Sequence, residues 1–198
     1  MTKYILNSGG LKNNPAKAVK FYNEVIKGLG NKPCILYCFF AEKRENWEEK
    51  YKKYTEGLLE LIDKDIKPIF ELAFPDKFVE QVERCDVINI HGGDDHLVQY
   101  WLKKFDLQEI FRDKVVATNS ASSNALSKYF WTCDWRQCMD GLGILPIKFI
   151  PHYKSDWGKD DPRGSIDWEK AYQELSEYGE KDLPVYALEE GNYIIFEI

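Results

Sequence analysis

Short apolar runs alternate with longer amphipathic segments through the first two thirds of the chain. The runs have the continuous apolar character of strands that are buried on both faces of a parallel sheet. They cover residues 4–6, 34–40, 68–72, 87–90 and 115–117. The segments between them repeat their apolar positions at helical spacing and cover residues 16–29, 47–62, 76–83 and 95–104. This alternation predicts an α/β fold, with a mostly parallel sheet flanked by helices on both faces.

The last third of the chain contains three further apolar runs. Residues 148–150 lead into Pro151-His152-Tyr153, which places His152 at the end of another strand. Residues 184–188 and 193–196 are separated by Glu189-Glu190-Gly191-Asn192. A short polar link between two apolar runs predicts an antiparallel hairpin at one edge of the sheet.

The length of the chain is typical of one domain, so the 198 residues are expected to form a single unit over residues 1–198. The formal net charge is −6, and acidic and basic residues are interspersed, as in Glu42-Lys43-Arg44-Glu45. No basic patch points to nucleic acid as a partner. The sequence leaves open whether the protein is a monomer or a homodimer.

Nothing in the sequence indicates a membrane partner or an exported protein. The first residues lack the long apolar region of a signal peptide, and no run reaches the length of a membrane-spanning helix. The five cysteines stand mostly in apolar or aromatic surroundings, which predicts reduced thiols. We therefore expect a cytoplasmic protein.

A serine at a strand-to-helix corner is the most informative chemical feature. The apolar run 115–117 ends in Thr118-Asn119-Ser120-Ala121, and a helix-like segment follows. In an open parallel sheet such a corner lies where ligands bind, beyond the carboxyl ends of the strands. A serine held there exposes its hydroxyl as a nucleophile, although a serine-rich helix cap would explain the same residues without chemistry.

A serine nucleophile needs a general base, and the chain offers only His91, His96 and His152. His152 is expected on the same rim of the sheet as Ser120, which proton transfer requires. A packing or surface histidine is the alternative interpretation. Three acids, Asp134, Asp140 and Asp156, are near enough in sequence to orient the imidazole, and spacing does not select one of them.

Gly92 and Gly93 follow the strand 87–90 and open a helix, so their backbone N–H groups are suited to stabilise an oxyanion. A tight turn capped by Asp94 or Asp95 explains the same residues structurally. The spacing of these acids and the flanking histidines matches no strong metal-ligand pattern, so no metal or other cofactor is expected. Three tryptophans are further candidates to line a pocket: Trp131, Trp135 and Trp157.

Three motifs together resemble the peptidase E and cyanophycinase family. They are Gly92-Gly93-Asp94, the turn from Asn119 to Asn124, and Gly141-Leu142-Gly143 running on to Pro151-His152-Tyr153. Their order and spacing are similar over most of the chain. The resemblance implies the class I glutamine amidotransferase-like fold and a serine peptidase of short peptides.

By resemblance, Ser120 is the nucleophile, His152 is the general base, and Asp134 stands near the family's aspartate. Gly93 and Ala121 would donate backbone N–H groups to the oxyanion. Two residues would bind substrate, namely Asn124 and Arg163. The family's peptidase E removes N-terminal aspartate from dipeptides, and Arg163 is the nearest candidate to bind that carboxylate. A turn arginine paired with Asp160 or Asp161 is the alternative interpretation of Arg163.

Two departures from the family's pattern leave activity open. The glycines that usually flank the nucleophile are replaced by Thr118 and Ser122, whose side chains are expected to crowd the turn. A catalytically silent amidotransferase-like protein that binds a small molecule or a partner is therefore the alternative function. A plain α/β hydrolase acting on esters is a third interpretation, which the short chain disfavours.

Overall fold

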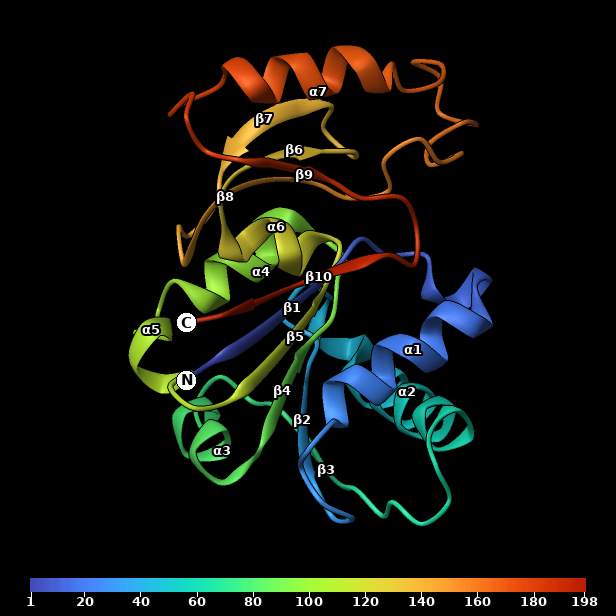
Figure 1. The fold of residues 1–198 in the computed structure, drawn as a ribbon, viewed down its shortest axis with the longest axis vertical. Coiled ribbons are helices and arrows are strands. Elements are labelled where there is room, and N and C mark those ends of the chain that lie inside the picture. Colours follow the sequence, from blue (N-terminus) through green and yellow to red (C-terminus); the bar gives the residue numbers. More distant parts are fainter.

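The computed structural model describes residues 1–198, and it contains two sheets stacked along the long axis of the molecule (Figure 1). The larger sheet has six strands in the order β10-β1-β5-β4-β2-β3. Their bounds are β1 Lys3–Asn7, β2 Cys34–Cys38, β3 Ile69–Leu72, β4 Val87–Ile90, β5 Val115–Asn119 and β10 Tyr193–Glu197. The first five are parallel to one another and β10 runs antiparallel to β1, so the predicted mostly parallel α/β sheet is confirmed.

Helices cover both faces of the larger sheet (Figure 1). On one face lie α1 (Pro15–Ile26) and α2 (Trp47–Leu61), and on the other lie α3 (Phe78–Arg84), α4 (Asp95–Leu102) and α5 (Leu107–Ile110). Single 3₁₀ turns precede α1 and α2, at Leu11–Asn13 and Arg44–Asn46. In α1 the buried residues recur every three or four positions, which is the spacing that brings side chains to one helix face: Ala18, Phe21, Tyr22, Val25 and Ile26.

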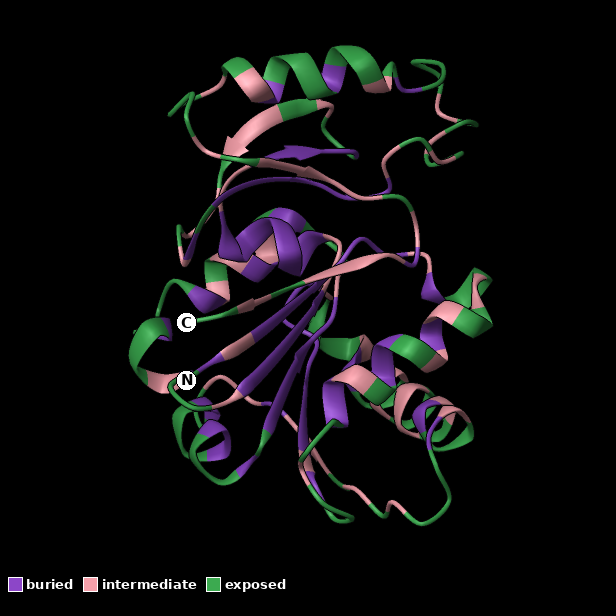
Figure 2. Ribbon diagram, in the orientation of Figure 1, coloured by how far each residue is buried: buried purple, intermediate pink, exposed green.

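The smaller sheet has the order β7-β6-β8-β9 and was not expected from the sequence. It is formed by β6 Ser127–Thr132, β7 Gln137–Asp140, β8 Leu145–Ile150 and β9 Val185–Ala187. The short helix α6 (Ala121–Leu126) leads into it from β5, and α7 (Trp168–Glu177) covers its outer face (Figure 1). Trp131, Ile150 and Leu175 belong to a small separate core beneath α7. Figure 2 shows that the central strands are buried while the outer helix faces are exposed.

The two C-terminal strands do not form the predicted hairpin. β9 pairs in parallel with β8 in the smaller sheet, whereas β10 pairs antiparallel with β1 in the larger one. Each strand therefore completes a different sheet, because both sheets offer an unpaired edge within reach of the chain. The polar link between them, residues 188–192, crosses from one sheet to the other.

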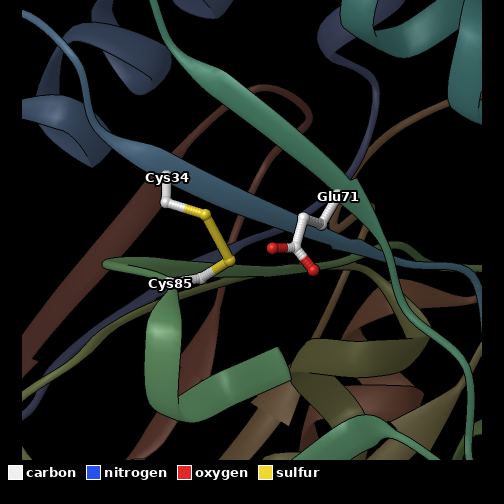
Figure 3. A group of neighbouring side chains, drawn as sticks. All are labelled: Cys34, Glu71 and Cys85. Carbon is white, nitrogen blue, oxygen red and sulfur yellow. A yellow bond between two sulfur atoms is a disulfide. The ribbon is translucent and has the colours of Figure 1, made fainter. Parts of the chain in front are cut away.

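Two of the five cysteines are not the reduced thiols that the sequence predicted. Cys34 and Cys85 are joined by a disulfide, with their Cα atoms 4.6 Å apart, and Glu71 lies beside the sulfur atoms (Figure 3). The bond links the start of β2 to the residue that follows α3, two positions before β4, at the amino ends of the strands. Cys38, Cys133 and Cys138 are free. No helix is both long and apolar enough to cross a membrane.

The central strands hold the larger sheet together through close packing, and Ile5 of β1 is completely buried there. We predict that Ile5→Ala lowers the free energy of unfolding by about 2–5 kcal/mol, because the substitution leaves a cavity between sheet and helices. Val79 of α3 is 41% exposed, and Val79→Ala is the control, expected to change stability by about 0.5 kcal/mol or less. Urea denaturation measures both, and equal losses would contradict this placement of the core.

Candidate active site

Ser120 occupies a strained turn between β5 and α6. Its backbone has φ 50° and ψ −110°, a conformation that residues with a side chain rarely adopt. Two backbone hydrogen bonds hold the turn: Ser120 N–H donates to Asn7 O at 2.9 Å, and Asn124 N–H donates to Ser120 O at 3.0 Å. The predicted strand, corner and helix are present, and the serine hydroxyl stands at the carboxyl end of the sheet.

Thr118 and Ser122, which replace the expected glycines, are accommodated by hydrogen bonds. The Thr118 and Ser123 hydroxyl oxygens lie 2.8 Å apart. The Ser122 hydroxyl donates to Ile90 O at 2.6 Å and accepts from Asn119 N–H at 2.8 Å. Both replacing side chains are fully buried, so they tie β4, β5 and α6 together rather than crowd the turn.

His152 follows the end of β8 and contacts Ser120 directly. The Ser120 hydroxyl lies 2.9 Å from His152 Nε2, and His152 Nδ1 lies 2.8 Å from Glu190 Oε1. A carboxylate only accepts hydrogen bonds, so Nδ1 carries the proton and donates it to Glu190. Nε2 is then the acceptor for the serine hydroxyl. The three side chains form a continuous chain of serine, histidine and glutamate.

Glu190, and not Asp134, contacts the imidazole, which corrects the acid suggested by the sequence. Asp134 instead accepts a hydrogen bond from Trp157 Nε1 at 3.4 Å. The other two acids are also elsewhere: Asp140 accepts from Tyr178 at 3.1 Å, and Asp156 lies 3.9 Å from Lys159. Glu190 was missed because it lies 38 residues beyond His152, in the link that was interpreted as a hairpin turn.

The model of Peptidase family S51 matches residues 4–197. The chain belongs to peptidase family S51. The resemblance to peptidase E that the motifs suggested is therefore confirmed at the level of the family.

Two solved structures show the same fold as this S51 chain. One is the crystal structure of a peptidase from an acI-B1 Actinobacterium, with a TM-score of 0.67 and 22% identity, which covers 99% of this chain and 83% of that one. The other is a putative peptidase E protein from Listeria monocytogenes EGD-e, with a TM-score of 0.63 and 14% identity over 100% of this chain and 99% of that one. No curated protein matches the chain.

His152 of the S51 chain is buried, with only 3% of its surface exposed. Burial lowers the pKa of His152 below its usual value of 6.5, and the hydrogen bond to Glu190 opposes this shift. Trp157 covers one face of the imidazole at a ring separation of 4.0 Å. At neutral pH the imidazole is therefore neutral, as a general base must be.

The glycine-rich loop after β4 lies against Ser120. A Cβ atom at Gly92 would stand 2.4 Å from Asn119 O and 3.2 Å from Ser120 Cβ, so only glycine permits this approach. The backbone N–H groups of Gly93 and Ala121, the two predicted oxyanion donors, take part in no backbone hydrogen bond. Both residues line the cavity in front of Ser120.

A cavity of about 510 Å³ extends from Ser120 and His152 toward α1 and α2. Asp95, Asn124 and Trp157 form part of its wall, and Lys12, Lys50 and Lys53 form part of the rest. Of the two predicted substrate-binding residues, Asn124 is therefore at the cavity. Trp157 is the one tryptophan of the three candidates that lines it, because Trp131 is in the smaller core and Trp135 is exposed.

Arg163, the other predicted substrate-binding residue, does not line the cavity. Its guanidinium is paired with Asp161 at 2.6 Å and also donates to Asp134 O at 2.8 Å. The histidines near the glycine loop lie apart from each other: His91 is buried against Tyr54, whereas the ring of His96 lies 5.5 Å from Trp135. Burial lowers the pKa of His91 to about 3, so it remains neutral.

Gly9 sets the position of His152, and this can be tested. A Cβ atom at Gly9 would lie 2.3 Å from His152 Cε1, so we predict that Gly9→Ala displaces the imidazole. A misplacement of about 1 Å costs on the order of 100-fold in rate, so labelling of Ser120 by a small fluorophosphonate should slow by this factor.

Gly28→Ala is the matched control, because Gly28 also has a positive φ but has open space around its Cα atom. It should carry the same backbone strain and leave labelling unchanged. Wild-type labelling rates in Gly9→Ala would contradict the contact between the β1 loop and His152.

Proposed function

We propose that the protein is a serine peptidase that hydrolyses short peptides through an acyl-enzyme on Ser120. The observation that carries the proposal is the unbroken hydrogen-bond chain from Ser120 through His152 to Glu190. Membership of peptidase family S51 supports the reaction class. The strained backbone at Ser120 supports an active site as well, since strain of this kind is retained mainly where function uses it.

The reaction proceeds in two halves. His152 Nε2 removes the proton from Ser120 as Oγ bonds to the peptide carbonyl carbon, and the oxyanion accepts hydrogen bonds from the N–H groups of Gly93 and Ala121. The C–N bond then breaks, and His152 returns the proton to the leaving amine. A water molecule, deprotonated by His152, then bonds to the acyl carbon, and the bond to Ser120 Oγ breaks as His152 returns the proton to Oγ. Glu190 stabilises the imidazolium that forms in each half.

The cavity supports a short and acidic substrate. Its volume of about 510 Å³ suits a peptide of a few residues. We propose N-terminal aspartate as the preferred first residue, as in the peptidase E that the motifs resemble. Because Arg163 is paired with Asp161 and Lys50 is paired with Glu42, the cationic groups available at the wall are Lys12 and Lys53.

The alternative function is a catalytically silent protein of the same fold that binds a small molecule. The replacement of the elbow glycines by Thr118 and Ser122 favours it. These two side chains are, however, hydrogen-bonded without opening the turn, which favours the enzyme. Hydrolysis separates the two functions.

We predict that the wild-type protein cleaves a panel of short peptides that includes Asp-Xaa dipeptides. Ser120→Ala and His152→Ala should each reduce kcat by about 10⁴-fold or more, because nucleophile and base act as one unit. Peptide hydrolysis followed by chromatography of the products measures this. A folded wild-type protein that cleaves no peptide would favour the silent binding protein.

A pair of conservative variants tests the acid. Glu190→Gln should lower kcat by about 10²–10⁴-fold, because the amide cannot stabilise the imidazolium as a carboxylate does. Asp134→Asn should lower it by less than about tenfold, since Asp134 makes no hydrogen bond to the imidazole. The opposite order would restore Asp134 as the acid.

The pH profile gives an independent prediction. Because burial lowers the pKa of His152, kcat/KM should rise with pH and level off with an apparent pKa below 6.5. Glu190 raises the pKa of His152, so in Glu190→Gln the midpoint should move to still lower pH. A midpoint above 6.5 in the wild type would show that His152 is not the neutral base.

A further inference from the structure

Asp95 is a buried carboxylate that no cation of the protein neutralises. It is the first residue of α4 and is 4% exposed. Asn124 Nδ2 donates to Oδ1 at 2.9 Å, and the Thr132 hydroxyl donates to Oδ2 at 2.6 Å. Both partners are neutral. A buried carboxylate costs several kcal/mol unless a charge compensates it, so two neutral donors leave the site electrostatically incomplete.

Asp95 forms part of the cavity wall. Asp95 and its partner Asn124 are close in sequence to Gly93 and Ser120, which would surround the reacting carbonyl. Asp95 follows Gly93 by two residues, and Asn124 follows Ser120 by one helical turn. The hydrogen bond between Asp95 and Asn124 ties the glycine loop to the helix that begins at the nucleophile. The carboxylate is therefore fixed relative to Ser120.

The surroundings of Asp95 offer acceptors to a ligand. Its carboxylate can accept further hydrogen bonds, and Asn124 Oδ1 is buried with no hydrogen-bond partner. A group that only donates is complementary to such a wall. An ammonium group has three N–H donors and no acceptor, and it carries the charge that Asp95 lacks.

The protein's own lysines at the cavity are placed elsewhere. Lys50 and Lys53 belong to α2, on the opposite face of the larger sheet from α4 (Figure 1), and Lys50 is paired with Glu42. Lys12 lies in the 3₁₀ turn before α1. The cavity is therefore anionic on the α4 side and cationic on the α1 and α2 side.

We propose that Asp95 binds the free α-ammonium group of the peptide and thereby sets which peptide bond reaches Ser120. The inference rests on the proposed peptidase function of Ser120. The α-nitrogen is separated from the first carbonyl carbon only by Cα. Holding the ammonium at Asp95 therefore brings the first peptide bond, and no later one, to the nucleophile.

The test compares a dipeptide with its N-acetyl counterpart, which lacks the positive charge and is otherwise the same at the scissile bond. Wild type should hydrolyse the free peptide at least about 100-fold better in kcat/KM, the factor expected when a buried charge is left unpaired. Asp95→Asn should lower kcat/KM by this factor for the free peptide and leave kcat/KM for the N-acetyl peptide unchanged. Asparagine keeps both neighbours, because the Thr132 hydroxyl can accept from the new amide.

Asp94→Asn is the matched control, because it removes the same charge one residue away. Asp94 is exposed, caps α4 by accepting from Leu97 N–H at 2.8 Å, and does not line the cavity. Asparagine also caps helices well. This variant should keep the preference for the free peptide.

Two results would overturn the inference. Equal loss on both peptides in Asp95→Asn would show that Asp95 only supports the fold, and equal cleavage of both peptides by wild type would show that the ammonium is not recognised. If wild type cleaves neither peptide, the proposed peptidase function fails, and calorimetry with Ser120→Ala still decides about Asp95. The inference is supported if Ser120→Ala binds the free dipeptide but not the N-acetyl dipeptide, and if Ser120→Ala/Asp95→Asn no longer binds the free dipeptide. Equal binding of the free and the N-acetyl dipeptide by Ser120→Ala overturns it.

Discussion

The hydrogen bond between His152 and Glu190 depends on the crossing of the chain from one sheet to the other. His152 follows β8 of the smaller sheet by two residues, while Glu190 lies between β9 and β10, which pair in different sheets. The loop after β1 fixes the crossing, because the Ser8 hydroxyl donates to Glu189 O at 2.8 Å and Gly191 N–H donates to Gly9 O at 2.6 Å. The contact between the imidazole and the carboxylate is thus a consequence of how the two sheets are joined.

The turn at Ser120 shows that a strand-to-helix corner with a positive φ can form at a serine without flanking glycines. Glycine is one solution to the close approach of helix and strand, because it has no side chain. Here the side chains that replace it are small and polar, and the Ser122 hydroxyl reaches Ile90 O in the neighbouring strand. These hydrogen bonds stabilise the strained backbone at Ser120. Thr118 and Ser122, which depart from the motif, therefore also stabilise the turn.

The sequence predicted what local patterns determine and missed what long-range pairing determines. Val87–Ile90 and the helix starts at Trp47 and Asp95 were predicted from apolar periodicity and agree with the structure. Ser120 and His152 were found because each ends an apolar run. The smaller sheet and Glu190 were not found, since edge pairing of short strands and an acid 38 residues from its partner leave no local pattern.

Ion pairing within the protein explains why a predicted binding residue can be present and yet be unsuited to its role. Arg163 has its charge satisfied by Asp161 and its geometry fixed by Asp134 O, so releasing it to a substrate would leave an acid unpaired. Lys12 and Lys53 make no ion pair within the protein and lie at the cavity wall. These lysines can therefore bind an acidic group without breaking an existing ion pair. The buried carboxylate of Asp95, on the α4 side, is screened far less by solvent than the lysines are. Under the proposed peptidase function, a short zwitterionic peptide would be oriented by its two ends, because only one direction along the cavity brings its positive end to Asp95 and its negative groups to the lysines.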